Sequence, residues 1–295
     1  MSRFEYAAPA SLEEVWNVYD RYGEGVTPLG GGTDLLVQIR ERGRPVRMLM
    51  SLRKLDALKG HSSRDGSLRI GASATAFEVA RSQIVKKLAP ALADGAELIG
   101  SIQVMNRATV AGNICNAAPS ADTGPALVVS GAEVVVIGPE GERRVAAIDF
   151  IQGPGKTALR PGEIVREIII PALAKNAGAS YIRHTPRKEM DIAVVGVGAY
   201  IRLDAAGQNV EDARVALGAV APTWRRSKRA EAALKGEALD SIDWREVGAG
   251  AAADASPIDD MRGSASFRRE LLEAYAPRAV RIAIARAQAE RGQRT

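Results

Sequence analysis

The apolar positions near the start of the chain recur at the spacing of one helix face. Val15 and Tyr19 lie four residues apart within residues 11–22. Ser11 and Glu14 stand at the two key positions of a capping box, in which the first side chain caps the helix and the second reaches back to it. The pattern predicts a helix over 11–22 with Ser11 as its N-cap.

Extended, glycine-rich and helical stretches follow this helix without a gap. Residues 26–30 have a short strand pattern, residues 34–42 a helical one, and residues 46–52 a second strand pattern. The order strand, helix, strand predicts a compact βαβ-like unit, with a run of glycines where the helix begins.

The middle of the chain mixes helical and extended patterns without an internal repeat. Residues 75–100 predict one or two helices interrupted near Pro90, and residues 101–123 predict irregular backbone because small residues and turn formers dominate there. The other elements predicted here are a strand at 68–74, a short helix at 124–130, a hairpin at 132–148 and a strand that ends at Pro171.

A change of composition at residues 172–180 predicts a linker between two domains, since the stretch is small and polar. The rest of the chain becomes mostly helical and rich in Ala, Arg and Glu. We therefore expect one domain over residues 1–173 and a second over residues 178–290. Strands and helices do not alternate regularly, so the expected fold class is α+β rather than a doubly wound sheet.

Length and composition are those of a globular chain with room for two cores. The sequence has 295 residues, of which 46% are apolar and 25% charged. No run of about 18 apolar residues occurs, so no membrane span is predicted. The N-terminus has no apolar core of signal-peptide length, and we expect a reducing, cytoplasmic setting.

Residues that carry metal or nucleophilic chemistry are scarce. Cys115 is the single cysteine, which excludes an internal disulfide framework and a cysteine-ligated iron–sulfur cluster within this chain. The two histidines, His61 and His184, are far apart in sequence, so no metal site is predicted. No set of nucleophile, base and acid can be assembled, and no catalytic residue is predicted.

The charge distribution argues against nucleic acid. The net charge is +5, and the densest basic stretch is residues 225–229. Aromatic residues make up only 4%, and no aromatic-interleaved basic face occurs of the kind that nucleic-acid binders use. A helix start or an interface with an acidic partner is the favoured interpretation of this stretch.

The glycine run at residues 30–32 indicates close approach of a ligand, often a phosphate, to the backbone. A Rossmann fingerprint would need a third glycine where Leu35 stands. A Walker A loop ending at residues 155–157 would need its first glycine where Phe150 stands. Both common phosphate-binding devices therefore fail.

Two separate glycine-rich loops remain, at residues 30–34 and 106–122. Successive N–H groups in such loops can converge on one anion, and Thr33, Thr109 and Asn113 can add side-chain donors. Two loops holding one diphosphate from both sides suit a dinucleotide such as FAD, although glycine clusters also serve tight turns. In the second loop, Asp122 is suited either to sugar hydroxyls or to capping the next helix.

At these residues the sequence resembles the FAD-binding medium subunit of molybdenum hydroxylases, of the aerobic carbon monoxide dehydrogenase and xanthine dehydrogenase type. The similarity runs in order along nearly the whole chain. The matching segments are residues 28–36, 70–80, 106–122, 150–171, 187–199, 213–234 and 262–272.

The resemblance implies a fold and a set of FAD contacts. The fold is a two-subdomain FAD-binding domain of the p-cresol methylhydroxylase (PCMH) type, followed by a smaller α+β domain with an antiparallel sheet. The first loop would wrap the diphosphate and ribityl region with Leu29, Gly30, Gly31, Gly32, Thr33, Asp34, Leu35 and Leu36. The other implied contacts are Thr109, Ala111, Gly112 and Asn113 at the diphosphate, Asp122 at the sugar hydroxyls, and Ile102, Val165 and Asp191 near the ring systems.

Two positions depart from the family pattern. The family usually has two glycines in the second loop, where this chain has Ala111 and Gly112, and a methyl group at the first of them restricts the backbone. Some relatives place a lysine directly after the Asp-x-Ala of the second domain, where this chain has Val194. A charge missing beside the flavin would change its potential or its electron acceptor.

The resemblance also implies a function without catalytic residues in this chain. It implies an electron-transfer subunit of a heterotrimer, with a molybdenum cofactor in a large partner subunit and two [2Fe–2S] clusters in a small one. A dimer of such heterotrimers is expected, with FAD as the cofactor of this chain. The alternative is a free-standing FAD-dependent oxidase of the PCMH-type superfamily.

Overall fold

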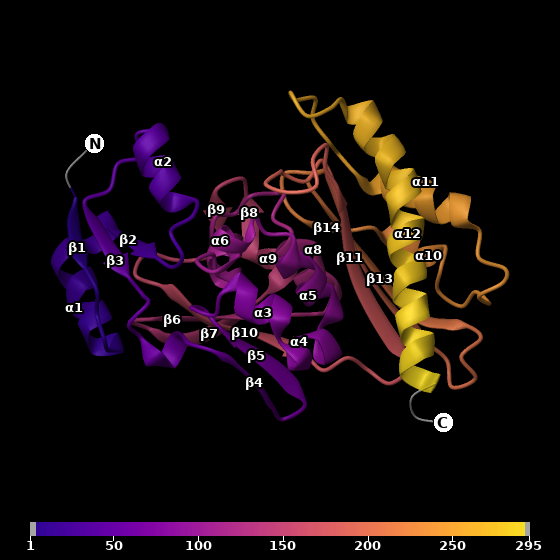
Figure 1. The fold of residues 1–295 in the computed structure, drawn as a ribbon, viewed down its shortest axis with the longest axis horizontal. Coiled ribbons are helices and arrows are strands. Elements are labelled where there is room, and N and C mark those ends of the chain that lie inside the picture. Colours follow the sequence, from indigo (N-terminus) through magenta and orange to yellow (C-terminus); the bar gives the residue numbers. More distant parts are fainter. Residues whose placement is uncertain (1–3, 293–295) are drawn as a thin grey trace.

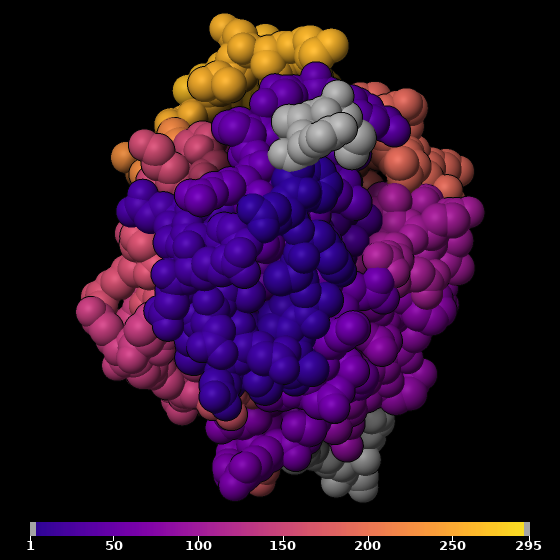
Figure 2. Space-filling model, turned by 90° about the vertical axis from the view of Figure 1, so that its left-hand side faces the viewer, coloured from indigo at the N-terminus to yellow at the C-terminus, as the bar shows by residue number. Residues whose placement is uncertain are grey.

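The computed structural model describes residues 4–292, and the chain forms three consecutive regions (Figure 1). The first is a small parallel sheet in the order β1-β3-β2, which covers much of the face seen in Figure 2. Its elements are β1 (Glu5–Ala7), α1 (Leu12–Tyr22), a 3-10 turn at Gly23–Gly25, β2 (Val26–Leu29), α2 (Leu35–Glu41) and β3 (Met48–Ser51). The parallel pairing of β2 with β3 around α2 confirms the predicted βαβ unit.

The cap of α1 differs from the predicted capping box in one bond. The Ser11 hydroxyl accepts from the N–H of Glu14, as expected. The Glu14 carboxylate accepts from the N–H of Ala10 at 2.7 Å, one residue before the N-cap. Ser11 therefore caps the helix, while the Glu14 carboxylate binds the backbone of Ala10, the residue before the cap.

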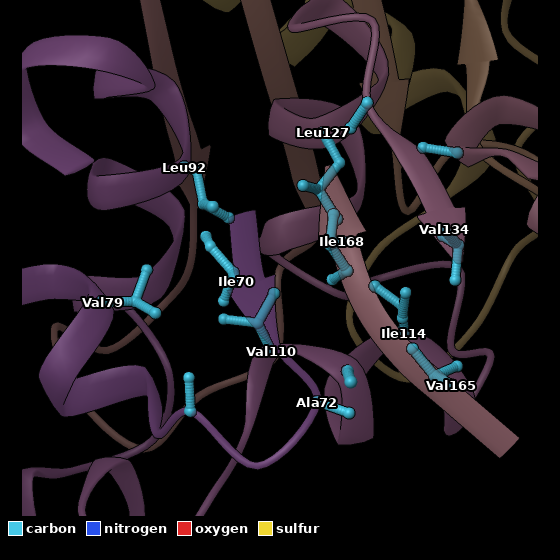
Figure 3. Close-up of a cluster of buried hydrophobic side chains, with 14 of the residues drawn as sticks. Ile70, Ala72, Val79, Leu92, Val110, Ile114, Leu127, Val134, Val165 and Ile168 are labelled. Carbon is cyan, nitrogen blue, oxygen red and sulfur yellow. The ribbon is translucent and has the colours of Figure 1, made fainter. Parts of the chain in front are cut away.

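The second region is a five-stranded antiparallel sheet in the order β4-β5-β10-β6-β7. Figure 3 shows Ile70 and Ile168 of this sheet near Leu92, Val110 and Leu127 of the helices. The elements are a 3-10 turn at Asp56–Leu58, β4 (His61–Arg64), β5 (Ser67–Gly71), α3 (Ala76–Arg81), α4 (Gln83–Leu88), α5 (Pro90–Glu97), α6 (Ile102–Met105), α7 (Val110–Cys115), α8 (Thr123–Val129), β6 (Glu133–Gly138), β7 (Gly141–Ala146), α9 (Ala147–Phe150), β8 (Ile151–Gly153), β9 (Lys156–Thr157) and β10 (Ile164–Pro171).

The prediction of irregular backbone over residues 101–123 is wrong. This stretch contains α6 and α7, whose N-caps are the hydroxyls of Ser101 and Thr109. Helices of four and six residues are too short to show an apolar periodicity. Their caps were the only local signal, and serine and threonine are equally common in turns.

The third region is a four-stranded antiparallel sheet between two layers of helices. Helix α12 covers one face, with α11 packed against it, and α5 and α8 of the second region cover the other (Figure 1). A Cβ at Gly198 would lie 2.7 Å from the carbonyl oxygen of Pro125, so the missing side chain lets α8 approach the sheet. The elements are β11 (Ala177–His184), β12 (Val195–Leu203), β13 (Val210–Gly218), β14 (Arg225–Arg226), α10 (Lys228–Ala232), α11 (Trp244–Asp254) and α12 (Ala265–Gly292).

Four of the nine residues of the predicted linker lie in a buried strand. Within residues 172–180, β11 begins at Ala177. A Cβ at Gly178 would lie 2.1 Å from the carbonyl oxygen of Ala283 in α12, so the small residues here permit close packing. The α+β fold class, with an antiparallel sheet in the C-terminal part, is confirmed.

Candidate functional site

The two glycine loops predicted to act together meet in the structure. A Cβ at Gly31 would lie 2.0 Å from the carbonyl oxygen of Arg107 and 2.8 Å from the Cα of Ala108. A Cβ at Gly30 would lie 3.2 Å from the Thr109 hydroxyl. We call residues 30–34 together with 107–113 the loop junction. Here glycine is required because one loop packs directly on the backbone of the other.

The backbone amides of the first loop have no acceptor among the residues that the structure describes. Within residues 4–292, nothing accepts a hydrogen bond from the N–H groups of residues 30–34, and these residues are only partly buried or exposed. Gly32 has φ +81°, a left-handed conformation that lets neighbouring N–H groups turn towards a common point. The loop therefore offers donors to an anion.

The second loop adds side-chain donors from the opposite side. The Thr109 hydroxyl accepts the N–H of Gly112 at 2.9 Å, which leaves its own proton to donate. The Asn113 carbonyl oxygen accepts from the Thr123 hydroxyl at 2.6 Å. The Asn113 amide nitrogen then has no acceptor in the described part of the chain. The Ala111 methyl packs in the core, so it leaves the junction open.

Asp122 is bonded to the C-terminal region rather than to its own helix. Its side chain makes no capping bond to α8, so the capping interpretation is wrong. The Tyr181 hydroxyl donates to one carboxylate oxygen at 2.8 Å, and Arg183 donates to the other at 2.5 Å. Burial raises the pKa of Asp122 to about 6, against the opposing effects of Arg183 and Tyr181. The carboxylate therefore joins the second loop to β11.

Three implied contact residues lie around the junction with different exposures. Val165 is buried in β10 and lies next to Ile114 of α7, which it supports from beneath (Figure 3). Ile102, at the start of α6, is 54% exposed, and Leu36 is 44% exposed. Only the latter two present side chains on the surface.

Asp191 orders an exposed loop, residues 185–193, between β11 and β12. Its carboxylate accepts from the N–H of Ile192 at 2.9 Å and from the N–H of Arg187 at 3.0 Å. The Ile192 N–H and then the Arg187 bonds hold the pKa of Asp191 below its usual range. The Met190 N–H reaches the carbonyl oxygen of Gly100 at 3.4 Å, so this loop lies beside the start of α6.

A cavity of about 370 Å³ lies between α2, the segment after α7 and the β8–β9 hairpin, and the sequence did not reveal it. Gln38 joins α2 to the segment after α7, because its amide donates to Asn116 at 2.8 Å and accepts from Arg44 at 2.7 Å. The lining residues are Gln38, Arg42, Arg44, Asn116, Ala117, Ala118, Pro119, Pro154 and Gly155.

Local patterns did not single out these residues, because they line one cavity only where α2, the segment after α7 and the β8–β9 hairpin meet in space. Arg42 follows α2, Asn116 follows α7, and Gly155 is in the β8–β9 hairpin rather than a Walker loop. Tyr181 and Arg183 were missed because their partner Asp122 is about 60 residues away in sequence. No local pattern marks such a pair.

The other chemically conspicuous residues have structural roles. Burial raises the pKa of Cys115 to about 12, so its thiol stays protonated near neutral pH and is a poor nucleophile. The basic run forms β14 and the start of α10, so the expected helix start covers only its second half, and Arg226 and Lys228 pair with Glu231. Among residues 4–292, no cluster of three metal-ligating side chains occurs, and no helix is long and apolar enough to span a membrane.

Comparison with known proteins matches both parts of the chain. The family described as "FAD binding domain in molybdopterin dehydrogenase" matches residues 2–173. The family described as "CO dehydrogenase flavoprotein C-terminal domain" matches residues 180–283.

Individual relatives match over most of their length. The chain is 33% identical to the putative xanthine dehydrogenase FAD-binding subunit of Escherichia coli, over 88% of this chain and 89% of the relative. It is 32% identical to the carbon monoxide dehydrogenase medium chain of Hydrogenophaga pseudoflava, over 96% of this chain and 98% of the relative.

Solved structures share the fold over nearly the whole chain. A chain of the Hydrogenophaga pseudoflava carbon monoxide dehydrogenase, in a form lacking the Mo-pyranopterin moiety, superposes with a TM-score of 0.92 at 32% identity. The superposition covers 97% of this chain and 98% of the carbon monoxide dehydrogenase chain. A chain of quinoline 2-oxidoreductase from Pseudomonas putida 86 superposes with a TM-score of 0.90 at 29% identity, and the superposition covers 98% of each chain.

Proposed function

The chain belongs to the family of FAD-binding subunits of molybdenum hydroxylases, and from this premise we propose that its loop junction holds the diphosphate of FAD. The observation that carries the proposal is the row of N–H groups at residues 30–34, for which residues 4–292 provide no acceptor. Thr109 and Asn113 face the same junction with a hydroxyl and an amide to donate. Neutral donors on rigid backbone suit a diphosphate that must be held but not transformed.

The other residues of the site suit the parts of FAD outside the diphosphate. Asp122 has two carboxylate oxygens, each with a further lone pair, and these can accept from sugar hydroxyls. Ile102 and the 185–193 loop present apolar surface suited to flat aromatic rings. When bound, FAD supplies a group that accepts and releases electrons, while the chain binds it, orients it and shields part of it.

The function proposed for the chain is electron transfer within a larger oxidoreductase. The curated relatives are named as a medium chain and as an FAD-binding subunit, which supports partners for this chain as well. We expect a large subunit with a molybdenum cofactor and a small subunit with two [2Fe–2S] clusters, assembled as a dimer of heterotrimers in the cytoplasm. Residues 1–173 would bind FAD, and residues 178–290 would close the site.

Binding of FAD by the purified chain is the first expected result. Titration of flavin-free protein should quench flavin fluorescence, and the protein should turn yellow. Riboflavin, which lacks the diphosphate, should bind about 100-fold more weakly, because at least two charge-assisted hydrogen bonds of about 1.5 kcal/mol each are lost.

Gly153→Ala is a matched control for the titration, because a Cβ there meets nothing within 4 Å. It should bind FAD like the wild type. Equal affinities for FAD and riboflavin would contradict the diphosphate clamp, and no binding of either flavin would contradict the proposed function as a whole.

Affinity purification under native conditions separates the two candidate functions. A subunit should co-purify with a molybdenum-containing and an iron–sulfur protein, and acid should release all its FAD. The protonated Cys115 thiol argues against covalent attachment. A lone chain that retains flavin after denaturation and oxidises a substrate by itself would favour the free-standing oxidase instead.

A further inference from the structure

The first turn of α12 touches both ends of the 185–193 loop. The loop closes where the N–H of Val194 donates to the carbonyl oxygen of His184 at 2.9 Å. The ring of Phe267 packs edge-on against His184, with ring centroids 6.1 Å apart. The next residue, Arg268, donates to the carbonyl oxygen of Val194 at 2.6 Å.

Arg268 joins three segments that are distant in sequence. Its side chain is 4% exposed, and the same nitrogen that bonds Val194 also donates to the carbonyl oxygen of Ala219 at 3.0 Å. The other terminal nitrogen donates to Asp260 at 2.7 Å. The guanidinium thus links the end of the 185–193 loop, the turn after β13 and the segment before α12.

The chemistry of this contact requires arginine. A guanidinium is planar and donates in several directions from one rigid group, whereas a lysine ammonium is a single point with a flexible stem. Hydrogen bonds from a buried charged donor to carbonyl oxygens are stronger than neutral ones. Asp260 balances the buried charge, so the contact does not leave an isolated ion in the interior.

The hydrogen bond from Arg268 to Val194 fixes the end of the 185–193 loop because Val194 is itself part of the core. Its side chain is fully buried in the core of the C-terminal sheet, while its carbonyl oxygen is held by Arg268. The resemblance places the segment from Asp191 to Val195, with which the loop ends, near the flavin ring. Anchoring Val194 therefore fixes where this part of the loop leaves the core.

We propose that Arg268 is a positioning residue that holds the 185–193 loop in place beside the flavin. The role beside the flavin rests on the proposed function, whereas the contact between Arg268 and Val194 is present without a flavin. Because its side chain is only 4% exposed, Arg268 would not reach the flavin directly. It acts through Val194, and Asp260 keeps the guanidinium oriented.

Limited trypsin digestion of the full chain, with and without FAD, tests the proposal. Arg187 and Lys188 lie in the exposed loop and supply cleavage sites. In Arg268→Met, early cleavage at these sites should be about tenfold faster than in the wild type, because the loop opens more often when a charge-assisted bond is lost. Arg269→Met changes the exposed neighbour and should leave the rate unchanged.

A second variant keeps the test decisive if Arg268→Met fails to fold. Asp260→Asn leaves the arginine in place but removes its charged partner, and it should give a smaller acceleration of the same cleavage. In FAD-loaded protein, the visible flavin spectrum should shift in Arg268→Met and recover in part in Arg268→Lys, which retains a donor.

The outcomes separate the two proposals. Wild-type cleavage rates in Arg268→Met, or in Asp260→Asn where the first variant does not fold, would overturn the positioning role. A cleavage difference in flavin-free protein, combined with no FAD binding by the wild type, would support the loop contact and overturn the proposed function. An unchanged flavin spectrum in a variant whose loop has opened would contradict the link to the flavin.

Discussion

Gly31→Ala is expected to lower the affinity for FAD by about 10- to 100-fold. The new Cβ would lie 2.0 Å from the carbonyl oxygen of Arg107. No rotamer change can relieve this clash, because the Cβ position is fixed by the backbone and the carbonyl oxygen is a backbone atom. The two loops must separate, and overpacking of this kind costs about 1–3 kcal/mol. The measurement is an FAD titration followed by flavin fluorescence.

Two comparisons distinguish loop separation from general damage. Gly30→Ala places its Cβ 3.2 Å from a single hydroxyl, that of Thr109, and should reduce affinity far less. Far-UV circular dichroism of Gly31→Ala should stay close to that of the wild type, since residues 30–34 belong to none of the hydrophobic core clusters. Unchanged FAD affinity in Gly31→Ala would show that the junction does not form the binding site.

Arg183→Met is expected to destabilise the protein by about 3–5 kcal/mol at pH 7.5, the range for removing one partner of a buried ion pair. Arg183 and Asp122 have side chains only 5% and 10% exposed, so water cannot replace the lost partner. The remaining carboxylate keeps only the Tyr181 hydroxyl. Urea denaturation followed by tryptophan fluorescence measures the loss.

The loss should depend on pH in a defined direction. Burial raises the pKa of Asp122 in the folded protein to about 6, so stability falls as the pH rises from the ordinary pKa of an aspartate to about 6, and the full cost of ionising Asp122 is present above that pH. Without Arg183 this cost increases and the pKa rises further. At pH 4.5 Asp122 is mostly protonated in both proteins, and the difference between variant and wild type should shrink.

The double variant Asp122→Asn with Arg183→Met supplies the control for this prediction. It removes both charges, so it should be more stable at pH 7.5 than Arg183→Met alone. A single-variant loss that is equal at both pH values, or that persists in the double variant, would show that Arg183 acts through packing rather than through its charge.

Local signals in the sequence were sufficient for several features. The apolar spacing and Ser11 predicted α1, and the order strand, helix, strand predicted the βαβ unit around α2. The glycine run marked the first loop, and the pairing of two glycine-rich loops suggested one anion site. These features depend on residues close together in the chain, so their patterns are readable without coordinates.

Other features have no local signal. Residues 101–123 look irregular but contain two capped helices, and Ala177–Ala179 look like a linker but form a strand between two helix layers. In both cases small residues serve close packing against elements from elsewhere in the chain. The same composition is typical of flexible loops, so only the neighbours decide which structure forms.

The sequence by itself determined the fold class, the family and the two loops, because glycine runs, caps and apolar spacing act over a few residues. Only the tertiary structure showed that Gly31 packs on Arg107, that Asp122 bonds Tyr181 and Arg183, and that Arg268 anchors Val194. These contacts join residues from separate regions. Close packing and buried charge pairing select them, and both depend on which groups share a place after folding rather than on their order in the chain.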